Sequence, residues 1–387
     1  MPSSIAILLL AHGTPNALGE MADYLSKVTG GRPLPAEVVA ELQHRYSEIG
    51  LRNEPGPEPP PLTKWTLAQG HLLQTALEKS GRPLPVYIAM RNWHPFIADV
   101  VAQMRADGIT RVLAICLAPQ NSRTSTGLYR LALMNAIDAT DAPKIEVIFV
   151  DAWPEEPALI EAFAQRLAES YPRACAEVAA SEPGDNDERT TTDRAPFIAR
   201  SCAMSGMEPP LPLATAGKGT ALPVLFTAHS VPERTVAATA ASEGTPAQPA
   251  DPYADQARRT AGLVFARATE LLAAQNQPDP RQSLFAFQSQ GVAGGPWLGP
   301  TVEETLATLA KEGHRGVVLQ PIGFVCDHVE ILYDIDIAFA ETARSLNLRL
   351  FRPESLNDSP LLTAALVSIV SKHLSAESGL RTSNLVP

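Results

Sequence analysis

The stretch Leu319–Asp336, LQPIGFVCDHVEILYDID, decides the fold because the chain changes there from a strand to a helix. The apolar residues Val317–Leu319 that lead into it are typical of a strand buried on both faces. Pro321 and Gly323 break this strand, and a helical pattern follows. Open parallel sheets bind ligands beyond the carboxyl ends of their strands. We therefore expect a functional site in the residues that come directly after this strand.

Three carboxylates occupy that position. Asp327, Glu330 and Asp334 are spaced i, i+3, i+7, which predicts that they share one face of a helix. Like charges at this spacing cost an exposed helix about 0.2–0.5 kcal/mol per pair, and more when they are buried. One interpretation is a solvated acidic face, and the other is a path for a cation. This stretch alone leaves both interpretations open.

Strands and helices alternate outward from this stretch along the whole chain. The predicted strands are 5–10, 86–90, 112–117, 145–150, 224–226, 283–287, 316–320 and 348–351. Such alternation predicts an α/β fold with parallel sheets and right-handed crossovers. LLAHGTP near the start and FTAHSVP in the middle have the same pattern of strand, Ala-His and Pro. Two similar lobes would place His12 and His229 at matching strand ends, facing a shared cleft.

We expect three parts in the chain: an N-terminal lobe 1–151, a C-terminal lobe 152–350, and a C-terminal helix and tail 351–387. The segment 175–222 is rich in Ala, Pro, Gly, Thr and charged residues and has no sustained periodicity. It is predicted to be a flexible, dispensable insertion in the C-terminal lobe.

Charge and cysteine content exclude several classes of protein. The net charge of -11 argues against a nucleic-acid partner or an anionic membrane surface. The apolar run 5–10 is too short for a signal peptide or a membrane span, so no stable membrane insertion is expected. Cys116, Cys175, Cys202 and Cys326 form no CxxC pair and are interpreted as free thiols in a reducing cytoplasm.

Two histidines have positions that suggest chemistry. His229 ends a predicted strand in a turn fixed by Pro232, which favours a base or metal ligand over a histidine bonded only to local backbone. His12 has the same kind of position, and both a chemical role and a purely local hydrogen bond remain open for it. A functional role also remains open for His328, which lies beside Asp327. The chain contains no GxGxxG, P-loop, GxSxG or HExxH motif, so the common nucleotide, hydrolase and zinc-protease sites are not supported.

AHSVPE at Ala228–Glu233 and GFVCDHVEILYDID at Gly323–Asp336 together resemble the ferrochelatase family. Further matches follow in family order: GTP at Gly13–Pro15, GGRP at Gly30–Pro33, RYSEIG at Arg45–Gly50, HPFI at His94–Ile97, DPY at Asp251–Tyr253, QSQG at Gln288–Gly291 and PWLGP at Pro296–Pro300. Each motif is weak alone, but the ordered series is highly specific. The resemblance extends from Ile5 to Val370, with insertions at 54–60, 175–222 and 237–250.

The resemblance implies two Rossmann-like lobes with a porphyrin cleft between them, and insertion of Fe²⁺ into a porphyrin in haem synthesis. The family's histidine and glutamate fall on His229 and Glu330, as catalytic residues and metal contacts, with Asp334 as a third metal contact. Porphyrin contacts are expected at His12, Arg45, Ser122, Tyr129 and Trp297. The expected partners are porphyrin and ferrous iron, both substrates of a monomeric enzyme. No permanently bound cofactor and no iron–sulfur cluster is expected.

The chemistry of metallation agrees with this assignment. Two pyrrole N–H protons must leave, and an imidazole with an ordinary pKa of about 6.5 is suited to accept them near neutral pH. Imidazole and carboxylate both suit Fe²⁺, and a positioned base typically contributes about 10²–10⁴-fold. We also hypothesise that His12 ligates the iron of the haem product from the face opposite His229. The alternative is that His12 only makes hydrogen bonds within the turn before Pro15.

Several positions depart from relatives and leave the porphyrin open. Bacterial relatives that metallate coproporphyrin often have Tyr at the position of His12. In relatives the row of acids usually continues one turn past Asp334, but this chain has Ala338 there. An Arg pair found in some relatives is Thr29-Gly30 in this chain. Coproporphyrin III is favoured over protoporphyrin IX, because membrane-association features of the other branch are lacking. The remaining alternatives are a cobalt or nickel chelatase and a non-catalytic tetrapyrrole-binding protein of the same fold.

Overall fold

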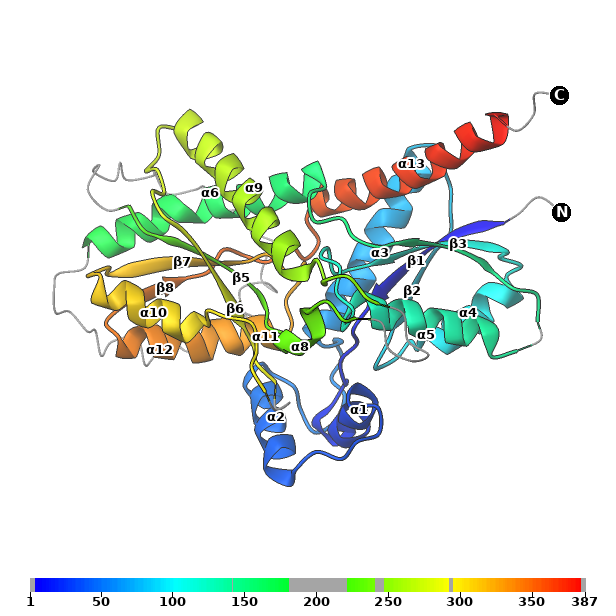
Figure 1. The fold of residues 1–387 in the computed structure, drawn as a ribbon, viewed down its shortest axis with the longest axis horizontal. Coiled ribbons are helices and arrows are strands. Elements are labelled where there is room, and N and C mark those ends of the chain that lie inside the picture. The colour runs from blue at the N-terminus through cyan, green and yellow to red at the C-terminus, as the bar shows by residue number, and fades with distance from the viewer. Residues whose placement is uncertain (1–3, 141, 181–220, 241–246, 292–294, 384–387) are drawn as a thin grey trace.

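The computed structural model describes residues 4–140, 142–180, 221–240, 247–291 and 295–383, with side chains up to residue 375. Their strands form two four-stranded sheets in which every pair is parallel (Figure 1). The first sheet contains β1 (Ile5–Ala11), β2 (Val86–Met90), β3 (Arg111–Cys116) and β4 (Glu146–Val150). The second contains β5 (Val224–His229), β6 (Ser283–Gln288), β7 (Gly316–Pro321) and β8 (Arg349–Phe351).

The two sheets have the same topology. Their strand orders are β2-β1-β3-β4 and β6-β5-β7-β8, so the first strand of each half is central in its sheet. The α/β class and the two similar lobes predicted from sequence are therefore confirmed. The division into the three parts expected from sequence stays a prediction.

Helices connect the strands. In the first half they are α1 (Met21–Val28), α2 (Ala36–Glu48), α3 (Pro61–Lys79), α4 (Ile97–Ala106) and α5 (Thr126–Asp138). In the second half they are α6 (Pro157–Ala180), α8 (Glu233–Val236), α9 (Tyr253–Ala274), α10 (Val302–Lys311), α11 (Val329–Leu332), a π-helix (Asp334–Phe339), α12 (Ala340–Ser345) and α13 (Pro360–Ser383). A short 3₁₀ turn, Leu18–Glu20, precedes α1. Among the described helices, none has both the length and the apolar character that crossing a membrane requires.

The turn after β1 shows how the sequence places a side chain at the strand end. All residues of β1 after Ile5 are buried, as expected for a strand covered on both faces. Gly13 then has φ +87, and a Cβ there would lie 2.8 Å from the backbone nitrogen of Trp93. Only glycine fits this close turn, which leaves His12 at the carboxyl end of the central strand.

One hydrophobic core is shared by the two lobes. It combines Leu73 and Leu77 of α3 with Phe163 of α6, Phe226 of β5 and Leu366 of α13. α6 lies along the second sheet and α13 along the first, and the two meet near the middle of the molecule (Figure 1). The opposite faces have separate cores, formed with α4 and α5 in the first lobe and with α10, the π-helix and α12 in the second.

Hydrogen bonds from the loop after β3 also join the lobes. Gln120, 2% exposed, donates through Nε2 to Thr260 Oγ1 at 3.3 Å and to the Ile322 carbonyl at 3.2 Å. In the same loop, the Arg123 backbone nitrogen donates to Asp251 Oδ2 at 2.7 Å. Because these contacts are buried or half-buried, they fix the relative position of the lobes.

The helices α1 and α2 form a separate projection, which we call the lip (Figure 1). Its small core contains Met21, Tyr24 and Tyr46, and it extends to Trp93 of the first lobe. Partly buried Tyr333 of the second lobe packs against the same core. The lip therefore contacts both lobes at the side where β1 and β5 end.

The predicted insertion 175–222 begins too early and ends too late. Cys175 and Val178 belong to α6 and are each 1% exposed, and Leu222 is 3% exposed. Tyr171 fixes the far boundary, because its hydroxyl donates to the Leu222 carbonyl at 2.8 Å and accepts from the Leu222 nitrogen at 2.9 Å. Sequence reasoning missed these contacts because alanine-rich helix and loop have similar composition. The rest of that insertion, residues 181–220, lies outside the described residues.

Candidate active site

The centre of the candidate site is a pair of side chains from two elements of the second lobe. His229 is the last residue of β5, and Glu330 is in the first turn of α11. His229 Nε2 and Glu330 Oε1 are 3.3 Å apart, and the side chains are 33% and 32% exposed. His229 Nδ1 contacts the Ser230 carbonyl, which directs Nε2 toward the carboxylate.

The pair is charged at neutral pH. Burial acts to lower the pKa of His229, but the Glu330 carboxylate and the Ser230 carbonyl outweigh it, and the pKa rises to about 9. Burial acts to raise the pKa of Glu330, but the His229 imidazolium outweighs it, and the pKa falls to about 2. An imidazolium therefore faces a carboxylate when no substrate is present.

Gln288 fixes the position of Glu330 relative to His229. Gln288 is 1% exposed and is the register partner of His229 on the neighbouring strand β6. Its Nε2 donates to the Glu330 carbonyl at 2.8 Å, and its Oε1 accepts from the Thr227 hydroxyl at 2.6 Å. The carboxamide thus connects β5, which carries His229, to α11, which carries Glu330.

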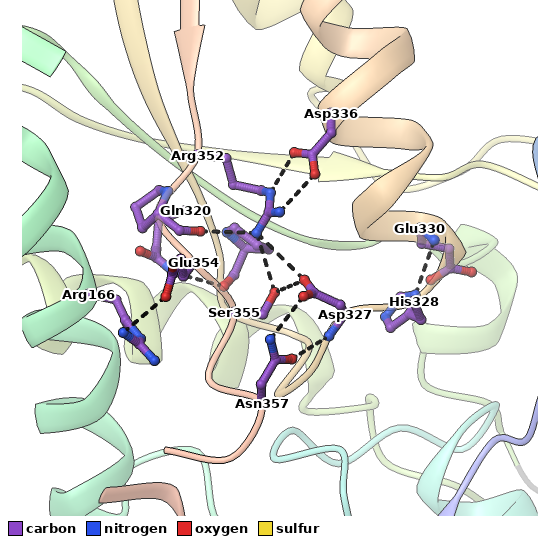
Figure 2. Close-up of polar contacts among 12 residues, drawn as sticks. Arg166, Gln320, Asp327, His328, Glu330, Asp336, Arg352, Glu354, Ser355 and Asn357 are labelled. Atoms are coloured by element: carbon purple, nitrogen blue, oxygen red, sulfur yellow. Dashed lines mark hydrogen bonds and ion pairs between the residues drawn. The ribbon is translucent and has the colours of Figure 1, made fainter. Parts of the chain in front are cut away.

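The prediction that Asp327 shares a helix face with Glu330 and Asp334 is wrong. The helix starts only after His328, an N-cap in extended conformation whose Nδ1 accepts from the Glu330 nitrogen at 3.1 Å. Asp327 lies before this cap, so helical spacing does not apply to it. Its carboxylate instead accepts from Ser355 and Asn357, away from the Glu330 side chain (Figure 2). The sequence pattern alone did not show where the helix begins.

Asp334 continues the acidic row beyond Glu330. It is 6% exposed, accepts a short hydrogen bond from the Ser289 hydroxyl, and lies 3.5 Å from Arg45 Nη1. Burial raises the pKa of Asp334, and the nearby Glu330 charge raises it further. Arg45 comes from α2 of the lip, also pairs with Glu41 at 3.0 Å, and is thus held at the outer end of the acidic row.

His12 lies at the matching strand end of the first lobe, as predicted. Asn92 Nδ2 is 3.0 Å from His12 Nε2, while His12 Nδ1 is 3.1 Å from the Gly13 carbonyl and 3.3 Å from the Tyr24 hydroxyl. With the amide donating to Nε2, the imidazole proton is on Nδ1. Burial lowers the pKa of His12, and the charges of Glu330 and His229 also act on it. Both ring nitrogens are therefore engaged within the first lobe.

A cation that sequence analysis did not single out lies beside His12. Arg91 follows β2, its guanidinium carbon is 5.8 Å from the centroid of the Tyr129 ring, and its charge contributes to lowering the His12 pKa. Tyr129 is 6% exposed, and burial raises its pKa. No carboxylate of the described residues forms an ion pair with Arg91. Its position directly after a strand was the signal that could have identified it.

The other two expected porphyrin contacts make local interactions. Ser122 is 1% exposed, and its hydroxyl is 3.0 Å from Thr124 Oγ1 in the turn before α5. Trp297 pairs with Pro232 in the turn after His229 and packs against Gly291. Glu330 interacts electrostatically with His12, Tyr129 and His229, and Asp334 links this group to Arg45.

The donor atoms of the His229–Glu330 pair are of types that bind iron. In the described part of the chain, no group of three or more His, Cys, Asp or Glu side chains has the geometry of a metal site. The His229–Glu330 pair offers one imidazole nitrogen and one carboxylate, which are suitable ligands for Fe²⁺.

Comparisons with known proteins agree with this arrangement. A family model described as Ferrochelatase matches residues 4–182 and 212–374. A protein named ferrochelatase from Acidobacterium capsulatum is 47% identical over 383 residues, 98% of this chain and 96% of that protein. A ferrochelatase from Herpetosiphon aurantiacus is 35% identical over 96% of this chain and 99% of its own length. Coproporphyrin III ferrochelatase 2 from Bacillus cereus is 28% identical over 96% of this chain and 94% of its own length.

Proposed function

This chain belongs to the ferrochelatase family, and we propose that its His229–Glu330 pair performs the chemistry of that family. The protein is a porphyrin metal-chelating lyase that inserts iron into a porphyrin in haem biosynthesis. The observation that carries the proposed roles is the 3.3 Å approach of His229 Nε2 to Glu330 Oε1 at the carboxyl end of β5.

His229 is the base and Glu330 the metal ligand in this proposal. Metallation breaks two pyrrole N–H bonds, forms iron–nitrogen bonds and releases two protons, without a change in oxidation state. A neutral His229 accepts the two protons one after the other, passing the first to solvent before it takes the second, and the Glu330 carboxylate replaces water on Fe²⁺. The iron leaves the site bound to the porphyrin nitrogens.

The ion pair sets an order for these steps. Without iron, Glu330 holds His229 in its charged form, which cannot accept a proton. A cation bound to Glu330 neutralises the carboxylate charge, so the partly exposed His229 releases its proton to solvent and becomes a base. Asp334, at the outer end of the acidic row beside Arg45, supplies iron to Glu330.

The test is turnover of two variants. His229→Ala and Glu330→Gln should each lose about 10²-fold or more in kcat while still binding porphyrin. The reaction is followed anaerobically with Fe²⁺ by the visible spectrum of the porphyrin. Near-normal turnover of either folded variant would refute these roles.

We propose coproporphyrin III as the porphyrin. Support comes from relatives named coproporphyrin III ferrochelatase, and from Arg91, whose guanidinium lies over the Tyr129 ring and could bind a substrate carboxylate. Coproporphyrin has more carboxylates than protoporphyrin, so it gains more from such a cation. Parallel anaerobic assays of the wild type with each porphyrin decide the question, and a higher kcat/KM for protoporphyrin IX would overturn the proposal.

We propose that His12 ligates the iron of the product. Ligation through Nε2 requires that Asn92 releases its hydrogen bond of 3.0 Å, because the same lone pair serves both partners. The competing role is the one seen without substrate, in which His12 only joins Asn92 to the Gly13 turn.

We also propose that the enzyme acts as a monomer in the cytoplasm. The net charge of -11 supports the cytoplasmic location, since it disfavours binding to an anionic membrane. Sedimentation of the purified protein and fractionation of cells test the two parts separately.

A further inference from the structure

Four acids lie in the segment Asp327–Asp336, namely Asp327, Glu330, Asp334 and Asp336. Arg352 lies behind this acidic segment and binds its last acid, Asp336. It follows β8 directly, and its side chain is only 7% exposed. Two parallel hydrogen bonds join it to Asp336 of the π-helix, from Nε to Oδ1 at 2.6 Å and from Nη2 to Oδ2 at 2.7 Å (Figure 2). This bidentate geometry fixes both the distance and the orientation of the carboxylate.

The first acid of the segment, Asp327, is bound by residues 352–357, the loop that follows β8. Asp327 Oδ1 lies 3.7 Å from Arg352 Nη1 and accepts from the Ser355 hydroxyl at 2.6 Å. Asn357 donates to Asp327 Oδ2 at 2.9 Å and accepts from the Asp327 backbone nitrogen at 2.9 Å. Residues 352–357 therefore hold both Asp327 and Asp336, and Figure 2 shows the guanidinium between the two carboxylates.

Glu330 and Asp334 lie between these two anchors and point elsewhere. Glu330 approaches His229, and Asp334 contacts Ser289. We propose that Arg352 is a positioning residue for metallation, which directs Glu330 and Asp334 to the site by binding the other two acids of the same segment. This inference rests on the proposed function of Glu330.

The charges explain why Arg352 is needed. The side chains of Asp327 and Asp336 are 18% and 30% exposed, so a carboxylate that loses its guanidinium partner can turn toward water. This movement would turn or unwind the π-helix, whose wider turn is already marked by the bond from the Ala338 nitrogen to the Tyr333 carbonyl at 3.0 Å. Such a turn would move Glu330 away from Nε2 of His229.

The loop is in turn fixed to the first lobe. Gln69 of α3, 2% exposed, donates through Nε2 to the Asn357 carbonyl at 2.8 Å. Arg352 thus places the acids relative to both lobes, including the one that carries His12.

The experiment compares Arg352→Lys, Arg352→Gln and Asp336→Asn with a matched control, Glu354→Gln. Glu354 is in the same loop, is 58% exposed, and pairs with Arg166 at 3.3 Å without touching the acidic segment (Figure 2). Each variant is assayed anaerobically for kcat, KM for Fe²⁺ and KM for porphyrin, well below its own melting temperature.

We expect kcat/KM for iron to fall about 10-fold to 100-fold in Arg352→Gln and Asp336→Asn, with KM for porphyrin within about twofold of the wild type. Arg352→Lys keeps the charge without the bidentate geometry and should lose less. Glu354→Gln should match the wild type. If Arg352→Gln does not fold, Asp336→Asn, which is nearly isosteric, decides the question.

Native kcat and KM values in variants that are merely less stable would overturn the proposal, as would an equal rise of both KM values. The wild-type assay separates this failure from that of the proposed function. If the wild type metallates and the variants match it, only the role of Arg352 is lost.

Discussion

Replacing Glu330 by Gln should change the protonation of His229 by a large and measurable amount. The pKa of His229 is about 9 because the Glu330 charge and the Ser230 carbonyl outweigh burial. Glutamine keeps the size of the side chain and removes the charge that raises the pKa most, so the pKa of His229 should fall. At pH 7.5 the protonated fraction of His229 should therefore be lower in the variant than in the wild type.

The pair should also affect stability in a defined pH window. The folded-state pKa of His229 lies above its ordinary 6.5, so this contribution is complete below pH 6.5 and is lost as the pH rises through about 9. The pKa of Glu330 lies below its ordinary 4.5, so that contribution is complete above pH 4.5 and is lost toward about 2. The stability difference between wild type and Glu330→Gln should be largest between pH 4.5 and 6.5, and modest in size because the side chains are a third exposed.

The assay is NMR of protein with ¹⁵N-labelled histidine, titrated between about pH 5 and 10, with His229→Ala to assign the signal. Arg166→Gln serves as a control, because Arg166 pairs with Glu354 and has no contact with His229 or Glu330. A wild-type His229 that titrates near 6.5, or an unchanged pKa in Glu330→Gln, would refute the reasoning.

Three further outcomes are expected. Asp334→Asn should raise KM for iron more than KM for porphyrin in steady-state assays, and the opposite ratio would mean that Asp334 is only a local charge. His12→Ala should shift the Soret band of the product complex and speed haem release, whereas an unchanged spectrum would leave only the hydrogen bond with Asn92. Tyr171→Phe should lower the free energy of unfolding by about 1–3 kcal/mol in urea denaturation, since it leaves two backbone groups of Leu222 unsatisfied.

The sequence predicted those features that depend on local pattern. Buried strands such as Ile5–Ala11, and the repeated Ala-His-x-x-Pro turn, were sufficient to predict two parallel sheets with His12 and His229 at matching ends. The chemistry of His229 and Glu330 came from the family motifs, since spacing alone did not separate an acidic surface from a cation path.

The missed features depend on contacts between distant segments. Asp327 and Glu330 are three residues apart, but an extended His328 separates their directions, and only Asn357 and Ser355 explain where Asp327 goes. Arg352 carried no motif, because its role depends on the loop after β8 lying behind the acidic row. Similarly, only the contact between Tyr171 and Leu222 marks where the predicted insertion ends.

The core shared by the two lobes bears on how such a chain could have arisen and how it can be divided. The repeated topology has the form expected of a duplicated ancestral unit, yet Leu73 and Leu77 of the first half now pack with Phe163 and Phe226 of the second. A half-chain made alone would expose these side chains to water and would aggregate. The same surfaces should make the two halves reassemble when they are produced together as separate polypeptides.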